Sequence, residues 1–348
     1  MADTPENTPN RKKEHIELCL TDRVAFKEKR NGFDQYEFEH NAITEVEIDK
    51  INFRTQFFGH EINFPFIISC MTGGTSEAEN INARLATVAN ELNIPLGVGS
   101  QRQALENQEY HSSYRIIRQN APDIPILGNI GAAEIAHLKS VSEIQYLIDM
   151  ISAQAFVIHV NPLQELIQKN GEPNFKGLLR NIEKVANSVS VPLIVKEVGA
   201  GIGKEAARKL LEAGVQAIDV AGAGGTSWSG VEILRNRGNE NDYFWDWGLP
   251  TSYCLRTVRD LKEEYSFILI GSGGISNGVE IAKAMALGAD LTASARIILQ
   301  KLEAGGMEGV KNLITDWFDT VKRIMYLTGC QTVDELKKIK LVNKGELY

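Results

Sequence analysis

Eight short apolar runs recur along this chain of 348 residues, with helix-like stretches between them. The runs start mostly about 25 to 40 residues apart, as a repeating strand, loop and helix require. They are Phe66–Met71, Leu96–Val98, Ile126–Ile130, Ala155–Val160, Leu193–Val198, Ala217–Ala221, Phe267–Gly271 and Leu291–Ala295. Eight such units predict a (β/α)8 TIM barrel, and a doubly wound open sheet is the alternative, because alternation alone does not show closure.

Three segments lie outside this repeat. Residues 1–60 form an expected N-terminal extension with a disordered start and the basic group Arg11-Lys12-Lys13, and residues 61–348 form the expected barrel domain. A long insertion after the sixth strand, from Thr226 to Leu261, is expected to be a lid, a binding loop or an interface. The stretch Val310–Leu341 predicts one or two helices.

Composition limits the class of protein. The four cysteines include no CxxC pair, which supports neither a disulfide framework nor a cysteine zinc site and fits a reducing cytoplasm. No apolar run approaches the roughly 20 residues that span a bilayer, and the first ten residues are polar rather than a signal peptide. A net charge of −8 disfavours broad nucleic-acid binding but allows a local basic pocket. We expect a cytoplasmic protein that binds neither membranes nor nucleic acid.

Polar or glycine-rich residues follow all eight runs, at the end of a barrel where enzymes keep their chemistry. The fourth run ends in His159, Asn161, Gln164 and Glu165, which handle protons and bind metals. The alternative for this segment is a helix N-terminus capped by Asn161, and His159 alone could be a core histidine bonded to a backbone carbonyl.

The last two runs predict a phosphate site. Gly273, Gly274 and Ile275 follow the seventh run and Ala295-Arg296 follows the eighth, where many barrels bind phosphate with backbone N–H groups. A simple glycine turn is the alternative. Lys196, at the end of the fifth run, suits a flavin site, and its alternative is an internal ion pair with Glu197 or Asp219.

The order of these motifs closely resembles the type 2 isopentenyl-diphosphate isomerases over nearly the whole chain. The resemblance rests on Arg11-Lys12, Met71-Thr72-Gly73-Gly74, Ser100-Gln101-Arg102, His159 to Glu165, Lys196 to Gly199, and Gly224-Gly225-Thr226. It implies an FMN-dependent barrel enzyme that interconverts isopentenyl diphosphate and dimethylallyl diphosphate by a 1,3-allylic proton shift. The reduced form of FMN would act as the acid and base, Mg²⁺ would bind the diphosphate, and NADPH or another reductant would reduce the flavin.

The resemblance also implies roles for single residues. The implied FMN contacts are Cys70, Met71, Thr72, Ser100, Asn129, Lys196, Thr226, Gly273, Gly274, Ile275, Ala295 and Arg296. The implied substrate contacts are Arg11, Lys12, Ser100, Gln101, Arg102 and Gln164. Glu165 would be the Mg²⁺ ligand, while His159, Asn161, Gln164 and Glu232 would be catalytic. Two alternatives from the residues stay open: Arg11-Lys12-Lys13 as a solvated tail, and Glu232 as a surface carboxylate.

Two other functions compete with this one. A flavin oxidase of 2-hydroxy acids would share the barrel and the lysine, but it needs a histidine base near the late strands, and no histidine follows His159. A non-catalytic flavin- or phosphate-binding barrel would leave Glu165 and Arg11-Lys12 without a role. Barrels of this kind often assemble, so we expect a homo-oligomer, a tetramer or an octamer.

Overall fold

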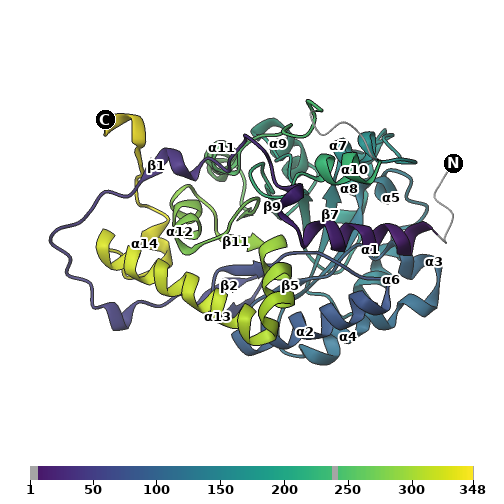
Figure 1. Ribbon diagram of the computed structural model, residues 1–348, viewed down its shortest axis with the longest axis horizontal. Coiled ribbons are helices and arrows are strands. Elements are labelled where there is room, and N and C mark those ends of the chain that lie inside the picture. Colours follow the sequence, from purple (N-terminus) through teal and green to yellow (C-terminus); the bar gives the residue numbers. More distant parts are fainter. Residues whose placement is uncertain (1–6, 237–241, 348) are drawn as a thin grey trace.

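Eight parallel strands close into a barrel in the computed structural model, which describes residues 7–236 and 242–347 (Figure 1). The order around the barrel is β10-β11-β4-β5-β6-β7-β8-β9, and β10 pairs with both β11 and β9. The strands are β4 (Phe66–Ile68), β5 (Leu96–Gly97), β6 (Ile126–Gly131), β7 (Ala155–Val160), β8 (Leu193–Glu197), β9 (Ala217–Asp219), β10 (Ile268–Gly271) and β11 (Leu291–Ser294). The predicted barrel is confirmed, and the open sheet is excluded.

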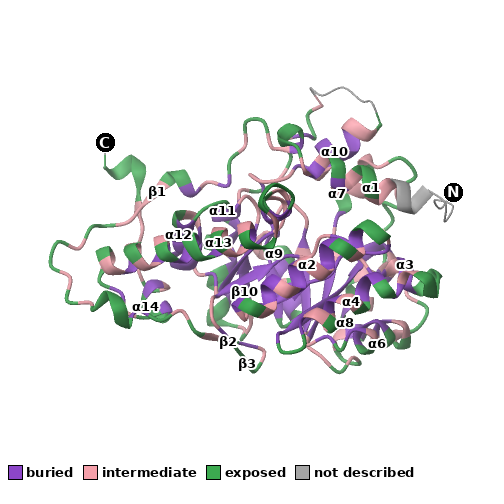
Figure 2. Cartoon of the chain, turned by 60° about the horizontal axis from the view of Figure 1, so that its bottom comes forward, coloured by how far each residue is buried: buried purple, intermediate pink, exposed green. Residues whose placement is uncertain are grey.

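Helices follow every barrel strand, and most of them cover its outer side. They are α2 (Ser76–Leu92), α3 (Arg102–Glu106), α4 (Ser112–Asn120), α5 (Ala132–Ala136), α6 (Val141–Met150), α7 (Pro162–Ile167), α8 (Leu178–Ala186), α9 (Lys204–Glu212), α10 (Trp228–Arg235), α11 (Thr251–Val258), α12 (Gly278–Ala286) and α13 (Arg296–Thr328). Figure 2 shows that the buried residues concentrate in the strands and on the helix faces toward them.

Two apolar clusters form because side chains alternate along each strand. On β7, Ala155 and Val157 belong to a small cluster inside the barrel, whereas Phe156 and Ile158 belong to the larger cluster under the helices. The hairpin of β2 (Thr55–Phe57) and β3 (His60–Ile62) adds Phe57 and Ile62 to the inner cluster. The hairpin thus fills the amino-terminal end of the barrel and leaves the other end for the site.

The N-terminal segment runs along the barrel before it enters the repeat. Helix α1 (Asn7–Cys19) lies beside α10 and α13 at the carboxyl ends of the strands (Figure 1). Strand β1 (Tyr36–Glu37) pairs with β12 (Val342–Asn343) near the other end of the chain. The expected disorder of the chain start falls partly on residues 1–6, which lie outside the described residues. The expected domain boundary at residue 60 falls in the β2–β3 hairpin.

The segment from Thr226 to Leu261 is not a single long loop. It contains α10 and α11, of which α11 packs on β10 and α9 as a barrel helix, while α10 is an added helix beside α1 and α7. The Ser227 hydroxyl caps α10 by accepting from Gly230 N. Trp245 is buried, and its indole Nε1–H donates to the Ala25 carbonyl oxygen. Residues 237–241 of this segment lie outside the described part.

The expectation of one or two C-terminal helices is confirmed, but the first begins earlier than expected. Helix α13 starts at Arg296, directly after β11, and bends at Gly306, whose φ is 65°. The shorter α14 (Val333–Leu336) begins with a capping box between Thr332 and Glu335. Within the described residues, no helix combines the length and the apolar character needed to cross a membrane.

Candidate functional site

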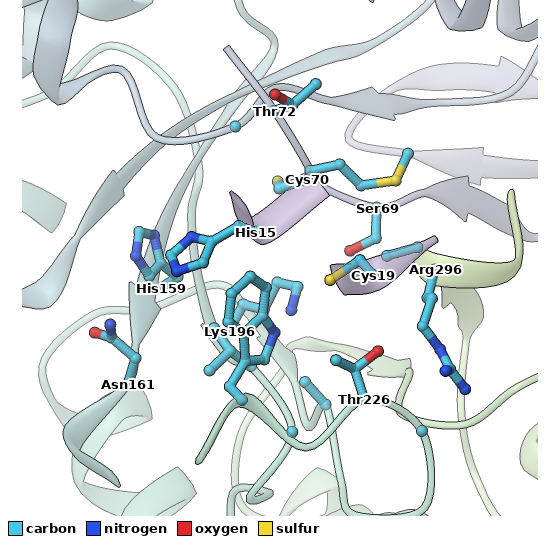
Figure 3. A pocket seen from close by; sticks show the side chains of 18 of the residues that line it. His15, Cys19, Ser69, Cys70, Thr72, His159, Asn161, Lys196, Thr226 and Arg296 are labelled. Carbon is cyan, nitrogen blue, oxygen red and sulfur yellow. The ribbon is translucent and has the colours of Figure 1, made fainter. Parts of the chain in front are cut away.

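A cavity of about 510 Å³ opens at the carboxyl ends of the barrel strands. This volume lies within the range of small-molecule and cofactor sites, roughly 300 to 1,000 Å³. Its wall comes from α1, from the loops after the strands and from the start of α13. Figure 3 shows His159 and Asn161 at one side of this space and Arg296 at the opposite side, with Lys196 and Thr226 between them. The cavity therefore has two distinct ends.

The floor of the cavity is set by strand alternation. Residues two positions apart on a strand face the same side. His159 therefore follows the inward Val157 on β7, and Lys196 follows the inward Ile194 on β8. The register pairs His159 with Lys196 and Lys196 with Asp219, so all three stand in one layer. The apolar interior thus changes into a polar layer where the strands end.

His159 is neutral in this layer. Burial lowers the pKa of its imidazole to about 4, and the charges of Lys196 and Arg102 act in the same direction, against that of Glu134. Its Nδ1 lies 2.8 Å from Asn129 Oδ1, an oxygen that accepts the Nδ1 proton. This tautomer leaves Nε2 as an acceptor. His159 lines the cavity and bonds the Asn129 side-chain amide, while a backbone hydrogen bond with Ile130 also acts on its pKa, so the alternative of a histidine bonded to a backbone carbonyl stays open.

Lys196 does not form the internal ion pair that was its alternative role. Among the described residues no carboxylate pairs with its ammonium, and Nζ instead donates to the Glu197 backbone oxygen at 2.6 Å. The Glu197 carboxylate is turned the other way and accepts from the backbone N–H groups of residues 198–201. Burial raises the pKa of Asp219, with Lys196 opposing this shift. The Lys196 charge therefore lines the cavity.

One end of the cavity is built from backbone. Helix α13 has Ala295 as its N-cap, a residue without a side-chain oxygen, so its first N–H groups have no side-chain cap. Beside it, a Cβ on Gly274 would lie 2.6 Å from the Gly224 oxygen, and one on Gly225 would lie 2.6 Å from Gly274 N. Only glycine permits this close approach of two loops. Free N–H groups at the start of a long helix fit a phosphate, which favours a phosphate site over a simple turn and fits the phosphate of FMN.

The other end of the cavity carries cationic side chains. Arg11, Lys12, His15 and Cys19 of α1 all line the cavity, with the spacing of one helix face. The Lys12 ammonium donates to the Gly73 oxygen at 2.6 Å and lies 3.4 Å from the Tyr114 hydroxyl. Burial, reinforced by Arg102 and Arg11, lowers the pKa of Lys12 to about 7. The basic segment is therefore part of the cavity wall and not a solvated tail.

Arg102 faces the same end and is held by two carboxylates. Its guanidinium lies 3.2 Å from Glu134 Oε1 and 3.4 Å from Glu106 Oε1. Glu134 also lines the cavity, close to His159. The neighbouring Gln101 is not on the cavity wall: its buried amide donates to the Leu147 oxygen and accepts from Asn129 N. The structure thus separates Gln101 from Ser100 and Arg102, which do line the cavity.

Asn161, Gln164 and Glu165 come together at the start of α7, as the sequence predicts. Asn161 Nδ2 donates to Gln164 Oε1 at 3.1 Å and to Glu165 Oε1 at 3.0 Å, while the buried Asn161 Oδ1 has no partner among the described residues. That oxygen suits a ligand that donates a hydrogen bond. Asn161 does not cap α7 through its side chain.

The donor set around Glu165 bears on Mg²⁺. No group of three or more His, Cys, Asp or Glu side chains able to hold a metal occurs within the described residues. Mg²⁺ is usually bound by one or two carboxylates together with substrate phosphates and water. Glu165 as the one carboxylate ligand therefore fits Mg²⁺ that arrives with a phosphorylated ligand, and does not fit a dedicated protein cage.

Glu232 is fully buried, so it is not a surface carboxylate. It lies behind the cavity wall, where it accepts from His15 Nε2 at 2.9 Å, Gln164 Nε2 at 3.0 Å and Arg235 Nη1 at 2.6 Å. Burial alone would raise its pKa, but these donors outweigh it and hold the pKa of Glu232 at about 2. The ionised carboxylate ties α1, α7 and α10 together.

The structure brings the other predicted site residues to the cavity, and only Gln101 and Glu232 lie off its wall. Further polar residues to which the sequence assigned no role also line it, among them His15, Gln103, Glu134 and Gln168. His15 was noted only as a neighbour of the Arg11-Lys12 motif, although it lies one helical turn after Arg11. Gln103 and Glu134 lie on short helices and carry no comparable local signal.

Comparison with known proteins gives two kinds of match in sequence. A family model described as FMN-dependent dehydrogenase matches residues 5–114 and 123–343. The isopentenyl-diphosphate delta-isomerase of Pelodictyon phaeoclathratiforme is 42% identical, covering 99% of this chain and 100% of its own. The enzymes of the same name from Chlorobaculum parvum and Pyrococcus abyssi are 43% and 40% identical, covering 97% and 98% of this chain and 98% and 94% of theirs.

Solved structures similar to the chain are flavoprotein barrels at low sequence identity. A flavocytochrome b2 variant with sulfite bound has a TM-score of 0.68 at 18% identity, covering 93% of this chain and 80% of its own. A mandelate oxidase variant with benzaldehyde has a TM-score of 0.67 at 15% identity, covering 97% of this chain and 96% of its own. At these identities the likeness concerns the fold alone.

Proposed function

The chain belongs to the isopentenyl-diphosphate delta-isomerases within the FMN-dependent dehydrogenase family, and from this membership we propose how its cavity performs that isomerisation. The enzyme interconverts isopentenyl diphosphate and dimethylallyl diphosphate by a 1,3-allylic proton shift with FMN as cofactor. The observation that carries the assignment of sites is the division of one cavity into a backbone-built end and a cationic end. Such a cavity fits two phosphorylated molecules side by side.

We assign the backbone-built end to the FMN phosphate. Gly273, Gly274, Ile275 and the start of α13 would hold it, with Arg296 adding a cation. The remaining proposed FMN contacts, Cys70, Met71, Thr72, Ser100, Asn129, Lys196, Thr226 and Ala295, line the cavity from there to the strand ends. Lys196 would place its ammonium beside the flavin, where a cation stabilises negative charge on the reduced ring.

We assign the cationic end to the substrate diphosphate. Arg11, Lys12 and Arg102 would bind its oxygens, with Ser100 and Gln164 as neutral contacts and Glu165 as the protein ligand of Mg²⁺. Gln101 would act through the backbone, since its amide fixes Asn129 N and not the cavity wall. Burial lowers the pKa of the Lys12 ammonium. A bound diphosphate would favour the protonated form and would therefore raise this pKa again.

The proton shift needs a group that protonates an unactivated alkene carbon and a group that removes a proton from the allylic carbon. Reduced FMN, when bound, supplies that acid–base chemistry and an electron-rich face for the developing cation. Neutral His159, Asn161 and Gln164 would orient the substrate and relay protons through their hydrogen bonds at the cavity wall, and among the three only the imidazole of His159 could itself accept a proton. Glu232 would act through Gln164 and His15, whose N–H groups it accepts.

Further assignments rest on the family and on composition. We propose Mg²⁺ as the metal, NADPH or another reductant as the source of electrons, a homo-oligomer such as a tetramer or octamer, and a cytoplasmic location. We also propose that residues 1–60 work as an extension whose basic segment closes over the substrate, and that residues 61–348 form the FMN-binding barrel.

The test is turnover of isopentenyl diphosphate by purified protein with FMN, Mg²⁺ and a reductant, scored for dimethylallyl diphosphate. We expect product only when the flavin is reduced, and none after Mg²⁺ is chelated. Product with oxidised flavin would contradict the proposed use of FMN. A yellow protein that makes no product under either condition, but reduces its flavin with a 2-hydroxy acid, would contradict the assignment of the cationic end.

A further inference from the structure

One buried side chain in the cavity wall has no partner in the protein. Gln103 is only 1% exposed, yet neither its Nε2 nor its Oε1 has a hydrogen-bond partner among the described residues. Gln101, two residues earlier and equally buried, shows the contrast, because both ends of its amide bond the backbone. A buried unpaired amide costs stability, roughly 1 to 3 kcal/mol, so a folded protein seldom keeps one without a use for it.

The amide of Gln103 lies at the cationic end of the cavity. Gln103 lines the cavity together with Gly73 and Lys12. A Cβ placed on Gly74 would overlap Gln103 Oε1 and would lie 2.9 Å from Lys12 Nζ, so both groups face the same small volume beside Gly74. A larger residue at position 74 would fill that volume. The glycine, the cation and the unpaired amide therefore belong to one subsite.

The charges around this subsite determine the class of ligand. Lys12, Arg11 and Arg102 provide positive charge, while Glu106 and Glu134 are already paired with Arg102. An anion with several acceptor oxygens satisfies both the ammonium and the two N–H groups of an amide. A neutral donor also adds a hydrogen bond without adding to the repulsion that already lowers the pKa of Lys12.

We propose that Gln103 is a further substrate-binding residue: its unpartnered amide turns about the Cγ–Cδ bond, so that Nε2 takes the place of Oε1 beside Gly74 and donates to an oxygen of the substrate diphosphate next to Lys12. This inference rests on the proposed function, because it takes the diphosphate to occupy the cationic end. In the free enzyme the unpaired amide lowers the free energy of unfolding. When the diphosphate binds, the amide forms its hydrogen bonds, and part of that free energy then contributes to binding.

The experiment compares Gln103→Met with Gln108→Met, which makes the same change on an exposed glutamine five residues away. For the reduced holoenzyme with Mg²⁺, the KM for isopentenyl diphosphate and the inhibition constant of inorganic pyrophosphate are measured. The melting temperature of the apoprotein and its affinity for FMN are measured as well. Methionine keeps the length of the side chain but removes its hydrogen-bonding groups. Gln103→Glu is the third variant, since it keeps the shape and places a negative charge against the diphosphate.

For Gln103→Met we expect KM and the pyrophosphate inhibition constant to rise about tenfold, with kcat within threefold and FMN affinity unchanged. The melting temperature should rise by about 2 °C, because the unpaired amide has gone. Gln103→Glu should weaken both constants about 100-fold. Gln108→Met should leave all four quantities unchanged. A gain in stability together with a loss of affinity is not expected from a purely structural residue.

Two outcomes would overturn the inference. If both constants stay unchanged in Gln103→Met, the amide bonds a trapped water and not the diphosphate. If FMN affinity falls and the diphosphate constants do not, Gln103 belongs to the flavin. Failure of the proposed function looks different: the wild type would make no dimethylallyl diphosphate, whereas weaker pyrophosphate binding by Gln103→Met would still support an anion subsite at Gln103.

Discussion

The two ends of the cavity, which we propose to bind phosphate, are built in different ways. At the α13 end the donors are backbone N–H groups, kept accessible by Gly273 and Gly274. At the cationic end, called the mouth below, the donors are the long side chains of Arg11, Lys12 and Arg102, which come from two separate segments. The first end belongs to the barrel itself. The second depends on where α1 packs.

This difference predicts where the protein is sensitive to pH. The cavity-lining cations and imidazoles whose pKa is lowered are Lys12 and His15 at the cationic end and His159 in the adjacent floor layer, whereas burial raises the pKa of the Cys19 and Cys70 thiols and keeps them neutral. Backbone N–H groups do not titrate. Binding of FMN phosphate should therefore vary little with pH, whereas binding of the substrate diphosphate should vary with it.

The largest effect should come from a single methyl group at the backbone-built end. In Gly274→Ala, the new Cβ would lie 2.6 Å from the Gly224 oxygen at a φ of +75°. The two glycine loops must then separate, and we expect FMN affinity to fall about 100-fold, measured by fluorescence quenching of the flavin. Gly177→Ala is the control, since it also has a positive φ, +88°, but no atom within 4 Å of its Cβ. Equal loss of FMN affinity in both variants would contradict the backbone site.

A smaller effect should appear at the mouth when the proposed metal ligand changes. Glu165→Gln keeps the hydrogen bond from Asn161 but removes the negative charge. We expect the Mg²⁺ concentration for half-maximal turnover to rise about 30-fold, with FMN affinity unchanged. The measurement is a Mg²⁺ titration of turnover at saturating substrate. Loss of FMN, or an unchanged Mg²⁺ requirement, would place the metal elsewhere.

The pH dependence of the mouth should follow Lys12. Because the pKa of its ammonium in the free enzyme is about 7, the cation is lost above neutrality, and KM for isopentenyl diphosphate should rise about tenfold between pH 7 and pH 8.5. The stability of the free enzyme should rise over the same pH range in which its affinity for the substrate falls. The folded-state pKa lies below the ordinary value of 10.5, so the unfolded chain binds more protons between these values and the free enzyme gains stability as pH rises.

Lys12→Met separates these two trends from other titrating groups. The variant should show a high KM that no longer changes between pH 7 and pH 8.5, and its melting temperature should lose the rise with pH. FMN affinity, measured over the same range, should stay constant in both proteins. A Lys12→Met enzyme whose KM still rises with pH would assign the titration to another residue.

The same contrast explains what could be predicted from the sequence. The barrel, its strand ends and the Gly273-Gly274-Ile275 loop follow from local pattern, because alternation along a strand and glycine after it have fixed meanings. The mouth does not follow from local pattern. Nothing near Glu232 in sequence shows that it will meet His15, which is 217 residues away. The unpaired amide of Gln103 depends likewise on how α3 packs, which no short sequence window contains.

The smallest expected effect on binding concerns the carboxylate that holds the mouth in place. Glu232 accepts from His15 on α1, from Gln164 on α7 and from Arg235 on its own helix. With its pKa held at about 2, below the ordinary 4.5, it stabilises the fold above pH 4.5, and this contribution is lost as pH falls from 4.5 toward 2. In Glu232→Gln we expect the free energy of unfolding at pH 7 to fall by about 2 kcal/mol.

The binding consequence of Glu232→Gln should be confined to the mouth. Arg11 and Lys12 keep their charges but lose a fixed support for α1, so KM for isopentenyl diphosphate should rise only about threefold, with FMN affinity unchanged. Urea unfolding at pH 7 and steady-state kinetics check both effects. Glu264→Gln is the matched control, because Glu264 pairs with Arg208 on the exposed surface and its loss should leave the free energy of unfolding almost unchanged. If Glu232→Gln instead lowers kcat more than 100-fold while stability and KM stay the same, Glu232 takes part in proton transfer itself, and the mouth is catalytic machinery and not only a binding surface.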